Sequence, residues 1–339
     1  MKYKRVIITQ PGSPDVLKVI EDELPEPRAG EVRVKILATG VAFTDVMMRE
    51  GVYPGVPKLP YSPGYDIVGI VDQLGSGVAE FTIGQRVVAL TIVGGYSEFL
   101  CVPARDLVVV PDGVNSIEAV SVVLHYLTAC QMLHRVAKVQ ARERILIHGA
   151  GGGVGTALLE LGKLAGLEMY GTEARSKHDL VSQLGGIPID YQAEDFGDRL
   201  QKLSNTLDVV LDSIGGSNLL RSYRLLRKDG RLVNYGFLSA FKGNKNKMLA
   251  IGATLLQVKV LNLIPDGRRV SFYSIADYKA THPDWYRADL TQLLNLLATG
   301  QIKPVVAECL PLTEARHAHE LLDRAAVSGK LVLICNPVE

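Results

Sequence analysis

A glycine run near the middle of this 339-residue chain constrains its fold more than any other feature. Three apolar residues, Ile145–Ile147, precede the run Gly149–Gly155, and a helical pattern continues through Ala165. Without β-carbons, the backbone N–H groups of such a turn can approach a pyrophosphate, and the following helix N-terminus favours an anion. The pattern Ala-x-Gly-x-x-Gly is a variant of the dinucleotide-binding fingerprint, and a glycine-rich turn without a ligand is the alternative. The predicted cofactor contacts are Ala150, Gly151, Gly152, Gly153, Val154 and Gly155.

Strand and helix patterns alternate from Arg144 onward. Ile145–Ile147 is short and wholly apolar, which is typical of a parallel strand covered on both faces. Further strands are predicted at 168–172, 187–190, 208–212 and 230–234, with helices at 177–184, 196–203 and 218–226. Ser271–Ile275 is the predicted last strand of this series. The alternation predicts a doubly wound parallel sheet of the α/β class.

The N-terminal third has a different pattern of short β runs. Val32–Ile36 alternates apolar and charged side chains, and glycine and proline separate it from the runs that follow. A small, twisted antiparallel barrel fits this spacing. Asn115 is expected to cap a helix that continues to Lys138, with Glu118 as its capping-box partner. Near the C-terminus, helices are predicted at 286–299 and 314–325 and a strand at 330–335.

Composition limits the kind of partner. With 37 Lys and Arg against 36 Asp and Glu, the formal net charge of +1 favours neither nucleic acid nor a membrane surface. The four cysteines, at 101, 130, 309 and 335, include no Cys-x-x-Cys pair, which argues against a zinc ribbon or a disulfide framework. No window reaches about 18 uncharged apolar residues, so no transmembrane helix is expected. We therefore expect a cytoplasmic protein.

The residues after the second strand bear on the choice between NAD and NADP. NAD sites usually carry an acid there to hold the ribose hydroxyls. Here the strand ends at Thr172, itself an expected cofactor contact, and Arg175 and Lys177 follow as partners for a 2′-phosphate. Tyr191 is expected to flank the adenine. These residues favour NADPH, whereas Glu173 is contrary evidence, and a solvated helix N-terminus is the alternative explanation for the two basic residues.

Five motifs, taken in order, resemble the medium-chain dehydrogenase/reductase superfamily in its zinc-free quinone oxidoreductase and enoyl reductase branch. They are Gly40–Pro54, Pro63–Val71, Gly94–Phe99, the glycine run and Gly329–Leu333. The resemblance covers nearly the whole chain. It implies a GroES-like β-barrel domain of residues 1–120 and 304–339, interrupted by a Rossmann NADP-binding domain of residues 121–303. In this family the active site lies between the two domains.

The resemblance also implies a site without a metal. Zinc members of the superfamily have ligands at positions that match Phe43, Tyr65 and Leu124, and none of these offers a thiolate or an imidazole. Without a Lewis acid, a conjugated acceptor is easier to reduce than a simple carbonyl. Charge then spreads onto a distant oxygen, which one hydrogen-bond donor can stabilise.

The same resemblance gives roles to individual residues. Tyr53 matches the tyrosine that lines the substrate cleft in related reductases and is the expected hydrogen-bond or proton donor. Thr44 and Tyr65 are further expected catalytic residues, and Asp45 is expected to order the loop. Related reductases often have Asn where this chain has Ala42, which cannot donate a hydrogen bond. On the cofactor side, the matching positions are Thr128, Asn234, Tyr235 and Gly236.

Together these features predict an NADPH-dependent oxidoreductase that acts on a quinone or on the C=C bond of an α,β-unsaturated carbonyl. Two alternatives stay open. One is a scaffold protein that binds the nucleotide without turnover, and the other is a biosynthetic reductase of an imine or of a carrier-tethered enoyl chain. In relatives the edge equivalent to Ser271–Ile275 pairs across a two-fold axis, so a homodimer is expected.

Overall fold

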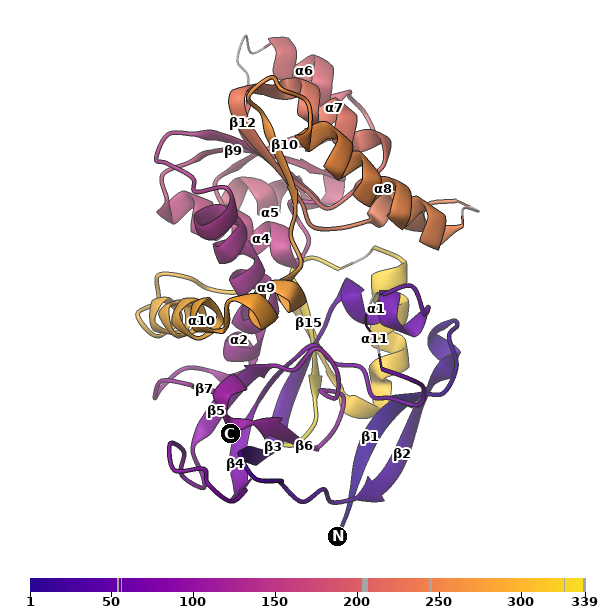
Figure 1. Cartoon of the computed structure of the whole chain (residues 1–339), viewed down its shortest axis with the longest axis vertical. Helices are drawn as coiled ribbons and strands as arrows, with labels where there is room; N and C mark the ends of the chain where they lie inside the picture. Colours follow the sequence, from indigo (N-terminus) through magenta and orange to yellow (C-terminus); the bar gives the residue numbers. More distant parts are fainter. Residues whose placement is uncertain (54, 56, 203–206, 244–245, 326, 338–339) are drawn as a thin grey trace. The chain divides into compact units, whose positions relative to one another are not determined.

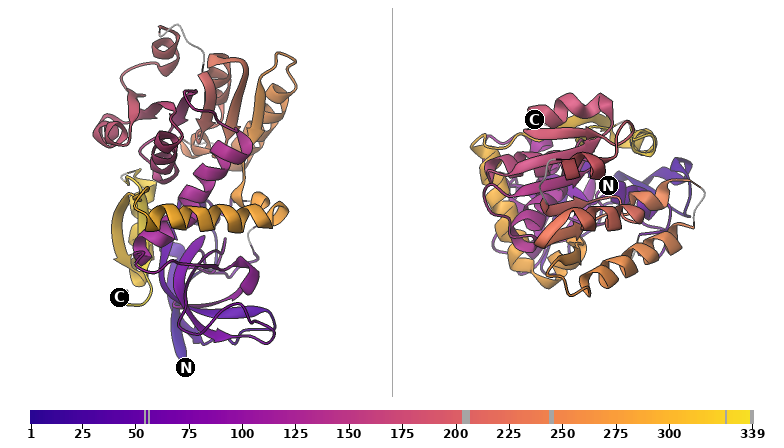
Figure 2. Two further views of the ribbon diagram at one scale, coloured as in Figure 1. Left: turned by 90° about the vertical axis from the view of Figure 1, so that its left-hand side faces the viewer. Right: turned by 90° about the horizontal axis from the view of Figure 1, so that it is seen from above.

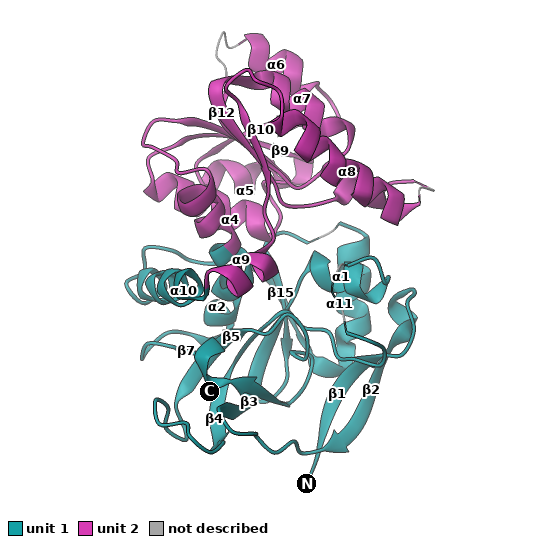
Figure 3. Ribbon diagram, in the orientation of Figure 1, with its two compact units in different colours: residues 1–127, 283–339 teal, residues 128–282 magenta. Residues whose placement is uncertain are grey.

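The chain forms two compact units in a computed structural model (Figure 1). The structure describes residues 1–53, 55, 57–202, 207–243, 246–325 and 327–337. The first unit consists of residues 1–127 and 283–339, and the second of residues 128–282 (Figure 3). The first unit is thus built from both ends of the chain, and the second interrupts it.

The first unit contains a largely antiparallel, seven-stranded sheet in the order β14-β15-β3-β4-β5-β7, with β6 paired to β3. Its strands are β3 (Glu31–Val41), β4 (Asp66–Leu74), β5 (Arg86–Leu90), β6 (Phe99–Pro103), β7 (Val108–Val109), β14 (Val306–Pro311) and β15 (Lys330–Ile334). β1 (Lys2–Ile8) and β2 (Leu17–Glu23) form a separate hairpin. The β3–β4 register shifts twice, and such bulges bend and twist a sheet. The barrel predicted from the short β runs is confirmed.

A buried ion pair joins the last strand of the chain to β4. The Lys330 ammonium lies 2.6 Å from a carboxylate oxygen of Asp66, and both side chains are at most 1% exposed. The Asp66 carboxylate also accepts from the backbone N–H groups of Gly40 and Leu124, at 2.9 and 3.2 Å. Removing one partner of such a pair leaves an uncompensated buried charge, so these two residues hold β15 firmly in the sheet.

A buried arginine joins α1 (Phe43–Arg49) to α11 (Ala315–Asp323). The Arg49 guanidinium contacts the Asp323 carboxylate at 3.1 Å and Nδ1 of His319 at 3.4 Å. Nε2 of His319 lies 3.1 Å from the Tyr96 hydroxyl. Burial, together with the Arg49 charge, lowers the pKa of His319 to about 3, so the ring is neutral. This network fixes α1, which contains Thr44 and is followed by the segment that carries Tyr53.

Helix α10 (Pro283–Ala298) belongs to the first unit, whereas the prediction included residues 283–303 in the Rossmann domain. The reason is visible in Tyr286, whose hydroxyl donates to the carbonyl of Asp106 at 2.7 Å and accepts from the N–H of Leu90 at 3.1 Å. These bonds hold the helix against β5 and the segment before β7.

The helix predicted after Asn115 is present, and the Asn115 side chain caps it by accepting from Ile117 and Glu118 N–H. It is not a regular α-helix throughout. α2 (Ser116–Ser121) continues through two π-helical stretches, Val122–Tyr126 and Gln131–Val136, on either side of α3 (Leu127–Cys130). Over the described residues, Ser116–Val136 is the one helical stretch long and apolar enough to cross a membrane. However, 89% of that window is buried inside the protein, as in a core helix.

The second unit contains a wholly parallel, six-stranded sheet in the order β10-β9-β8-β11-β12-β13. Its strands are β8 (Arg144–His148), β9 (Glu168–Glu173), β10 (Gly186–Asp190), β11 (Leu207–Asp212), β12 (Leu226–Asn234) and β13 (Arg269–Phe272). The connecting helices are α4 (Gly153–Leu164), α5 (His178–Gln183), α6 (Phe196–Lys202), α7 (Ser217–Leu225) and α8 (Lys247–Asn262). Figure 2 shows helices on both faces of this sheet. The order, 3-2-1-4-5-6 within the unit, confirms the predicted Rossmann sheet.

Two elements of the second unit differ from the sequence prediction. The last strand ends at Phe272 rather than Ile275, because the Ser274 hydroxyl caps a helix, α9 (Ile275–Thr281), by accepting from Asp277 N–H. Helix α8 has no counterpart among the predicted elements. It is apolar on nearly all sides and therefore lacks the one-sided periodicity of a surface helix. Its exposed large apolar residues are Met248, Leu249, Leu256 and Val260.

Candidate functional site

The glycine run forms a tight turn between β8 and α4. Gly149 has a φ of +74°, and Gly152 begins the helix without a side-chain cap among the described residues. A β-carbon on Gly155 would lie 2.2 Å from the carbonyl oxygen of Gly149, so no other residue fits there. Gly155 thus allows the close helix–strand packing expected of it. The turn leaves the N-terminus of a 12-residue helix open, which suits the phosphates of a dinucleotide.

At the end of β9, Glu173 reaches the glycine run. One carboxylate oxygen accepts from Gly151 N–H at 2.8 Å and the other from Ala174 N–H at 3.0 Å. Thr172, the residue that the sequence favoured here, turns its hydroxyl into the core and lies 2.8 Å from Nδ1 of the buried His148. The acid that seemed contrary evidence is therefore part of the turn. Glu173 is the last residue of β9, and nothing in the sequence indicates that its side chain bonds to Gly151.

The predicted 2′-phosphate residues follow Glu173. A β-carbon on Gly151 would lie 2.9 Å from Cδ of Lys177, so the lysine chain crosses the turn. Arg175 is exposed, and its guanidinium lies 3.4 Å from Nδ1 of His178. Tyr191 is 47% exposed, and the Lys242 ammonium stands 5.4 Å from its ring centroid. Lys242, which the sequence did not single out, adds a third cation to this end of the unit.

Asn234 is the last residue of β12, and its side chain has an unsatisfied acceptor. Its amide nitrogen donates to the carbonyls of Asp212 and Gly236, both at 3.0 Å. Its side-chain oxygen is buried and has no partner among the described residues. A β-carbon on Gly236 would lie 2.5 Å from the Ser213 carbonyl, so the backbone passes very close there. Burial raises the pKa of the neighbouring Tyr235 hydroxyl. A buried oxygen without a donor can accept from an amide such as that of a nicotinamide.

Thr128, a further expected cofactor residue, lies in α3 and is buried. Asp212 was not predicted. Its carboxylate accepts from the N–H groups of Ile214 and Gly215, both at 2.7 Å, and so fixes the loop after β11.

In the first unit, Asp45 fastens the start of α1 to the loop before β4. Its carboxylate accepts from the N–H groups of Ala42 and Gly64, at 2.9 and 3.0 Å. The ordering role expected for Asp45 is therefore confirmed. Burial, the largest influence, raises the pKa of Asp45 to about 7, although both backbone bonds act to lower it.

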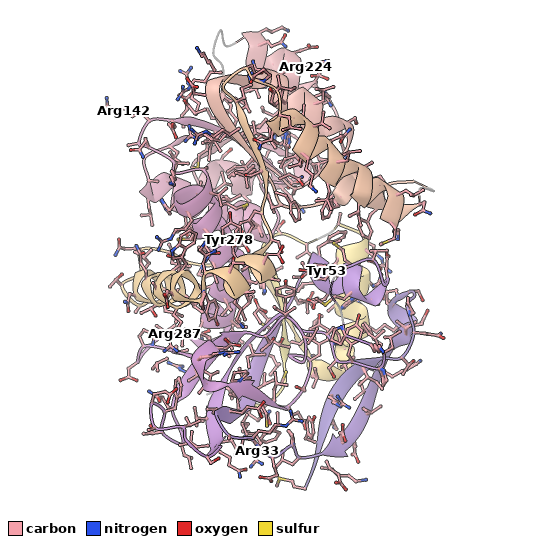
Figure 4. All side chains as sticks on the ribbon, in the orientation of Figure 1. Arg33, Tyr53, Arg142, Arg224, Tyr278 and Arg287 are labelled. Atoms are coloured by element: carbon pink, nitrogen blue, oxygen red, sulfur yellow. The ribbon has the colours of Figure 1, made fainter. Side chains whose placement is uncertain are left out.

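Two of the predicted catalytic residues are brought together. The hydroxyl oxygens of Tyr53 and Tyr65 are 2.6 Å apart, and their rings meet edge to face with centroids 6.1 Å apart. Tyr65 is fully buried, whereas Tyr53 is partly exposed on the segment after α1 (Figure 4). One of these hydroxyls donates to the other.

The third predicted residue, Thr44, has a buried hydroxyl without a partner among the described residues. A buried hydroxyl in this state is costly unless something else binds it. At the positions matched to zinc ligands, Phe43 begins α1 and Tyr65 bonds to Tyr53. Within the ranges that the structure describes, no three His, Cys, Asp or Glu side chains gather as a metal site.

Comparisons with known proteins agree with this architecture. A family model described as alcohol dehydrogenase GroES-like domain matches residues 28–112, and one described as zinc-binding dehydrogenase matches residues 186–333. The synaptic vesicle membrane protein VAT-1 homolog of Rattus norvegicus is 31% identical over 92% of this chain and 79% of its own length.

Two further comparisons concern quinone oxidoreductases. The enzyme of Mus musculus is 29% identical over 95% of both chains. A solved structure of Escherichia coli quinone oxidoreductase complexed with NADPH has a TM-score of 0.87 and 30% identity, covering 98% of this chain and 99% of that one. The chain therefore belongs to the medium-chain dehydrogenase/reductase superfamily, in its zinc-free branch.

Proposed function

We propose that this protein is a zinc-independent, NADPH-dependent oxidoreductase that transfers hydride to a quinone or to the C=C bond of an α,β-unsaturated carbonyl. The observation that carries the proposal is the Tyr53–Tyr65 hydroxyl pair, 2.6 Å apart. Such a pair can stabilise negative charge on a substrate oxygen without a metal. The similarity to quinone oxidoreductases supports the same reaction class.

NADPH is the proposed hydride donor. The turn between β8 and α4 would hold its pyrophosphate through the N–H groups of Gly153 and Val154, next to Ala150 and Gly152, while the Gly152 N–H donates to the Gly149 carbonyl within the turn. Lys177, Arg175 and Tyr191 would face the adenosine 2′-phosphate end. Asn234 would accept from the carboxamide at the other end, beside Tyr235 and Gly236, and Thr128 would lie near the ribose. The open helix N-terminus and the unsatisfied Asn234 oxygen support this assignment.

The protein itself contributes a hydrogen-bond and proton donor to the reaction. Because Tyr65 is fully buried, its hydroxyl is best placed to donate to Tyr53. Tyr53 then directs its own O–H to the carbonyl or quinone oxygen as charge develops there, and a phenolate forming on Tyr53 keeps the Tyr65 hydrogen bond. The Thr44 hydroxyl, which has no partner within the described part of the chain, supplies a second donor for the substrate.

The test is NADPH oxidation measured against a panel of quinones and enones by stopped-flow absorbance. Tyr53→Phe should lower kcat by on the order of 10²-fold and leave NADPH binding unchanged, since general acid catalysis contributes roughly that much. Tyr278→Phe, which alters a tyrosine stacked on His282 in the other unit, is the matched control. Full activity of Tyr53→Phe would contradict the assigned role.

One observation favours a second candidate, a nucleotide-binding protein without turnover. Ala42 offers only a methyl group where related reductases often have Asn, and its N–H is already bound by Asp45. Tight NADPH binding by fluorescence, with no hydride transfer to any member of the panel, would favour this function. Ala42→Asn would then test whether the missing side chain is the reason.

We also propose a cytoplasmic homodimer. The cysteines of the chain are all free thiols in the structure, which suits a reducing compartment. Among the described strands, β13 pairs only with β12 and so leaves an open sheet edge. α8 packs beside β13 and exposes apolar side chains, of which Leu249 is 72% exposed. An open edge next to an exposed apolar helix face is what a self-complementary interface needs.

A further inference from the structure

We propose that the first unit holds a ligand site separate from the proposed active site, and that it takes a small monocarboxylate with an apolar body. The site is a cavity of about 580 Å³ lined by residues of β3, β4, β5 and β7 and by the segment that leads into α2. Sites for small molecules usually have volumes of about 300–1,000 Å³. No lining residue belongs to the candidate active site or to the expected cofactor contacts, so the inference does not depend on the proposed function.

One arginine in this cavity is fixed in place and lacks a counter-ion. Arg86 is the first residue of β5, pairs with Ile70 of β4 and is partly buried. Its Nη1 donates to the Ser116 hydroxyl at 3.3 Å, and its Nη2 donates to the Pro111 carbonyl at 3.2 Å. Both partners are neutral, and over the described residues no acid pairs with Arg86. Each terminal nitrogen carries two hydrogens, so the guanidinium keeps N–H donors for an anion.

Aliphatic side chains line the same cavity. They come from Leu37 of β3, Ile70 of β4, Val109 of β7 and the neighbouring Val110. Leu37 and Val110 are only 4% and 3% exposed, whereas Val109 is 42% exposed. The aliphatic wall thus extends from the core of the unit to its surface. An apolar ligand body gains affinity by leaving water there, while its charged end binds the arginine.

A carboxylate in the lining limits the charge of the ligand. Asp112 is exposed, and within the described part of the chain no cation pairs with it. It repels a second negative charge, so a phosphate or a dicarboxylate is disfavoured. A single carboxylate matches the planar fork of Arg86 and carries only the charge that the arginine compensates. The ligand class is therefore an aliphatic or aromatic monocarboxylate.

The experiment uses 3-phenylpropanoate as the probe, with 3-phenylpropanamide as its neutral counterpart and benzylsuccinate as a dicarboxylate. Ligand-observed NMR titrations of the whole chain give the dissociation constants. A ligand of about 11 heavy atoms binds with roughly millimolar affinity at the efficiency usual for small molecules. The wild type should bind 3-phenylpropanoate more tightly than either of the other two compounds.

Arg86→Gln should weaken 3-phenylpropanoate by on the order of tenfold and leave the amide within about twofold, because only the carboxylate needs the charge-assisted hydrogen bonds. Asp112→Asn should tighten benzylsuccinate a few-fold more than 3-phenylpropanoate, since it removes the repulsion of the second charge. Arg28→Gln is the control. It removes an exposed arginine from the same unit and should leave all three constants within about twofold.

Equal wild-type affinities for 3-phenylpropanoate and its amide would show that no cation recognises the carboxylate, and the inference would be wrong. It is also overturned if Arg86→Gln keeps wild-type affinity, if Arg28→Gln loses as much, or if the wild type binds none of the probes. Melting temperatures report on folding. Should Arg86→Gln not fold, the exposed Asp112→Asn variant decides, because unchanged selectivity against benzylsuccinate contradicts the site. NADPH oxidation is measured separately, so failure here leaves the proposed function standing.

Discussion

At the scale of single residues, Asp45 links the geometry of the candidate site to pH. Its two backbone hydrogen bonds hold the loop that carries Tyr65 against the start of α1. Burial favours the protonated form and raises its pKa from the ordinary value of 3.8 to about 7. The folded protein therefore binds more protons than the unfolded chain between these two values. Stability from this group is fully present below about pH 4 and is lost as pH rises through about 7.

Asp45→Asn tests the direction of this pH dependence of stability. The free energy of unfolding of the wild type should fall relative to that of the variant as pH rises from 4 to 8, because only the wild type must ionise a buried carboxyl. Urea unfolding at several pH values measures the difference. Asp284→Asn, at the exposed start of α10, is the control and should follow the wild-type pH profile. Parallel profiles for wild type and Asp45→Asn would contradict the raised pKa.

Residue types and spacing predicted the parts of the site that local chemistry dictates. The glycine turn, the Asn115 cap and the ordering role of Asp45 all depend on neighbours in sequence, and the structure confirms them. The contact between Tyr53 and Tyr65 depends on how two loops fold, so spacing could not reveal it. The return of Glu173 to Gly151 joins residues 22 positions apart and was likewise hidden.

At the scale of elements, two glycines in helices make a matched pair. Gly155, in the first turn of α4, would place a β-carbon 2.2 Å from the Gly149 carbonyl oxygen, whereas Gly252 in α8 has nothing within 4 Å. Gly155→Ala should lower the free energy of unfolding by about 1–3 kcal/mol and weaken NADPH binding, because α4 must move off β8. Gly252→Ala should raise stability by about 0.5–1 kcal/mol.

Urea unfolding and NADPH fluorescence titration measure both variants. Equal stability changes of the same sign would show that backbone entropy alone decides the outcome, and would contradict the close packing of α4 on β8. Normal NADPH binding by Gly155→Ala would show that the packing of this turn does not affect cofactor binding.

Elements with a one-sided or alternating apolar pattern were predictable, and those without one were not. The strands of the parallel sheet are short apolar runs between helical patterns, helices α4–α7 follow one-sided patterns, and both sets are confirmed. α8 was missed because both its faces are apolar. The end of β13 was misplaced because Ser274 serves as a helix cap, which an apolar run does not reveal. The π-helical stretches around α3 have no sequence signature that we could identify.

At the scale of the whole molecule, the proposed homodimer predicts a concentration-dependent mass. Sedimentation of the wild type at micromolar concentration should give twice the mass of one chain. Leu249→Gln with Leu256→Gln should shift the protein toward monomer without lowering its unfolding free energy by more than about 0.5 kcal/mol, because both side chains are exposed. Ile83→Gln removes an apolar side chain that is 70% exposed in the other unit and serves as the control. A monomeric wild type would rule out the dimer.

The place of β15 in the first unit has a consequence for synthesis on the ribosome. β15 lies between β14 and β3, and Lys330 supplies the cation for the buried Asp66. While the chain is being made, residues 128–282 emerge with every strand of their sheet present. The N-terminal segment, in contrast, waits with the Ala38–Val41 part of β3 unpaired on one side and with Asp66 uncompensated until residues 330–334 leave the exit tunnel. The middle of the chain can thus fold first, and the part made first is completed last.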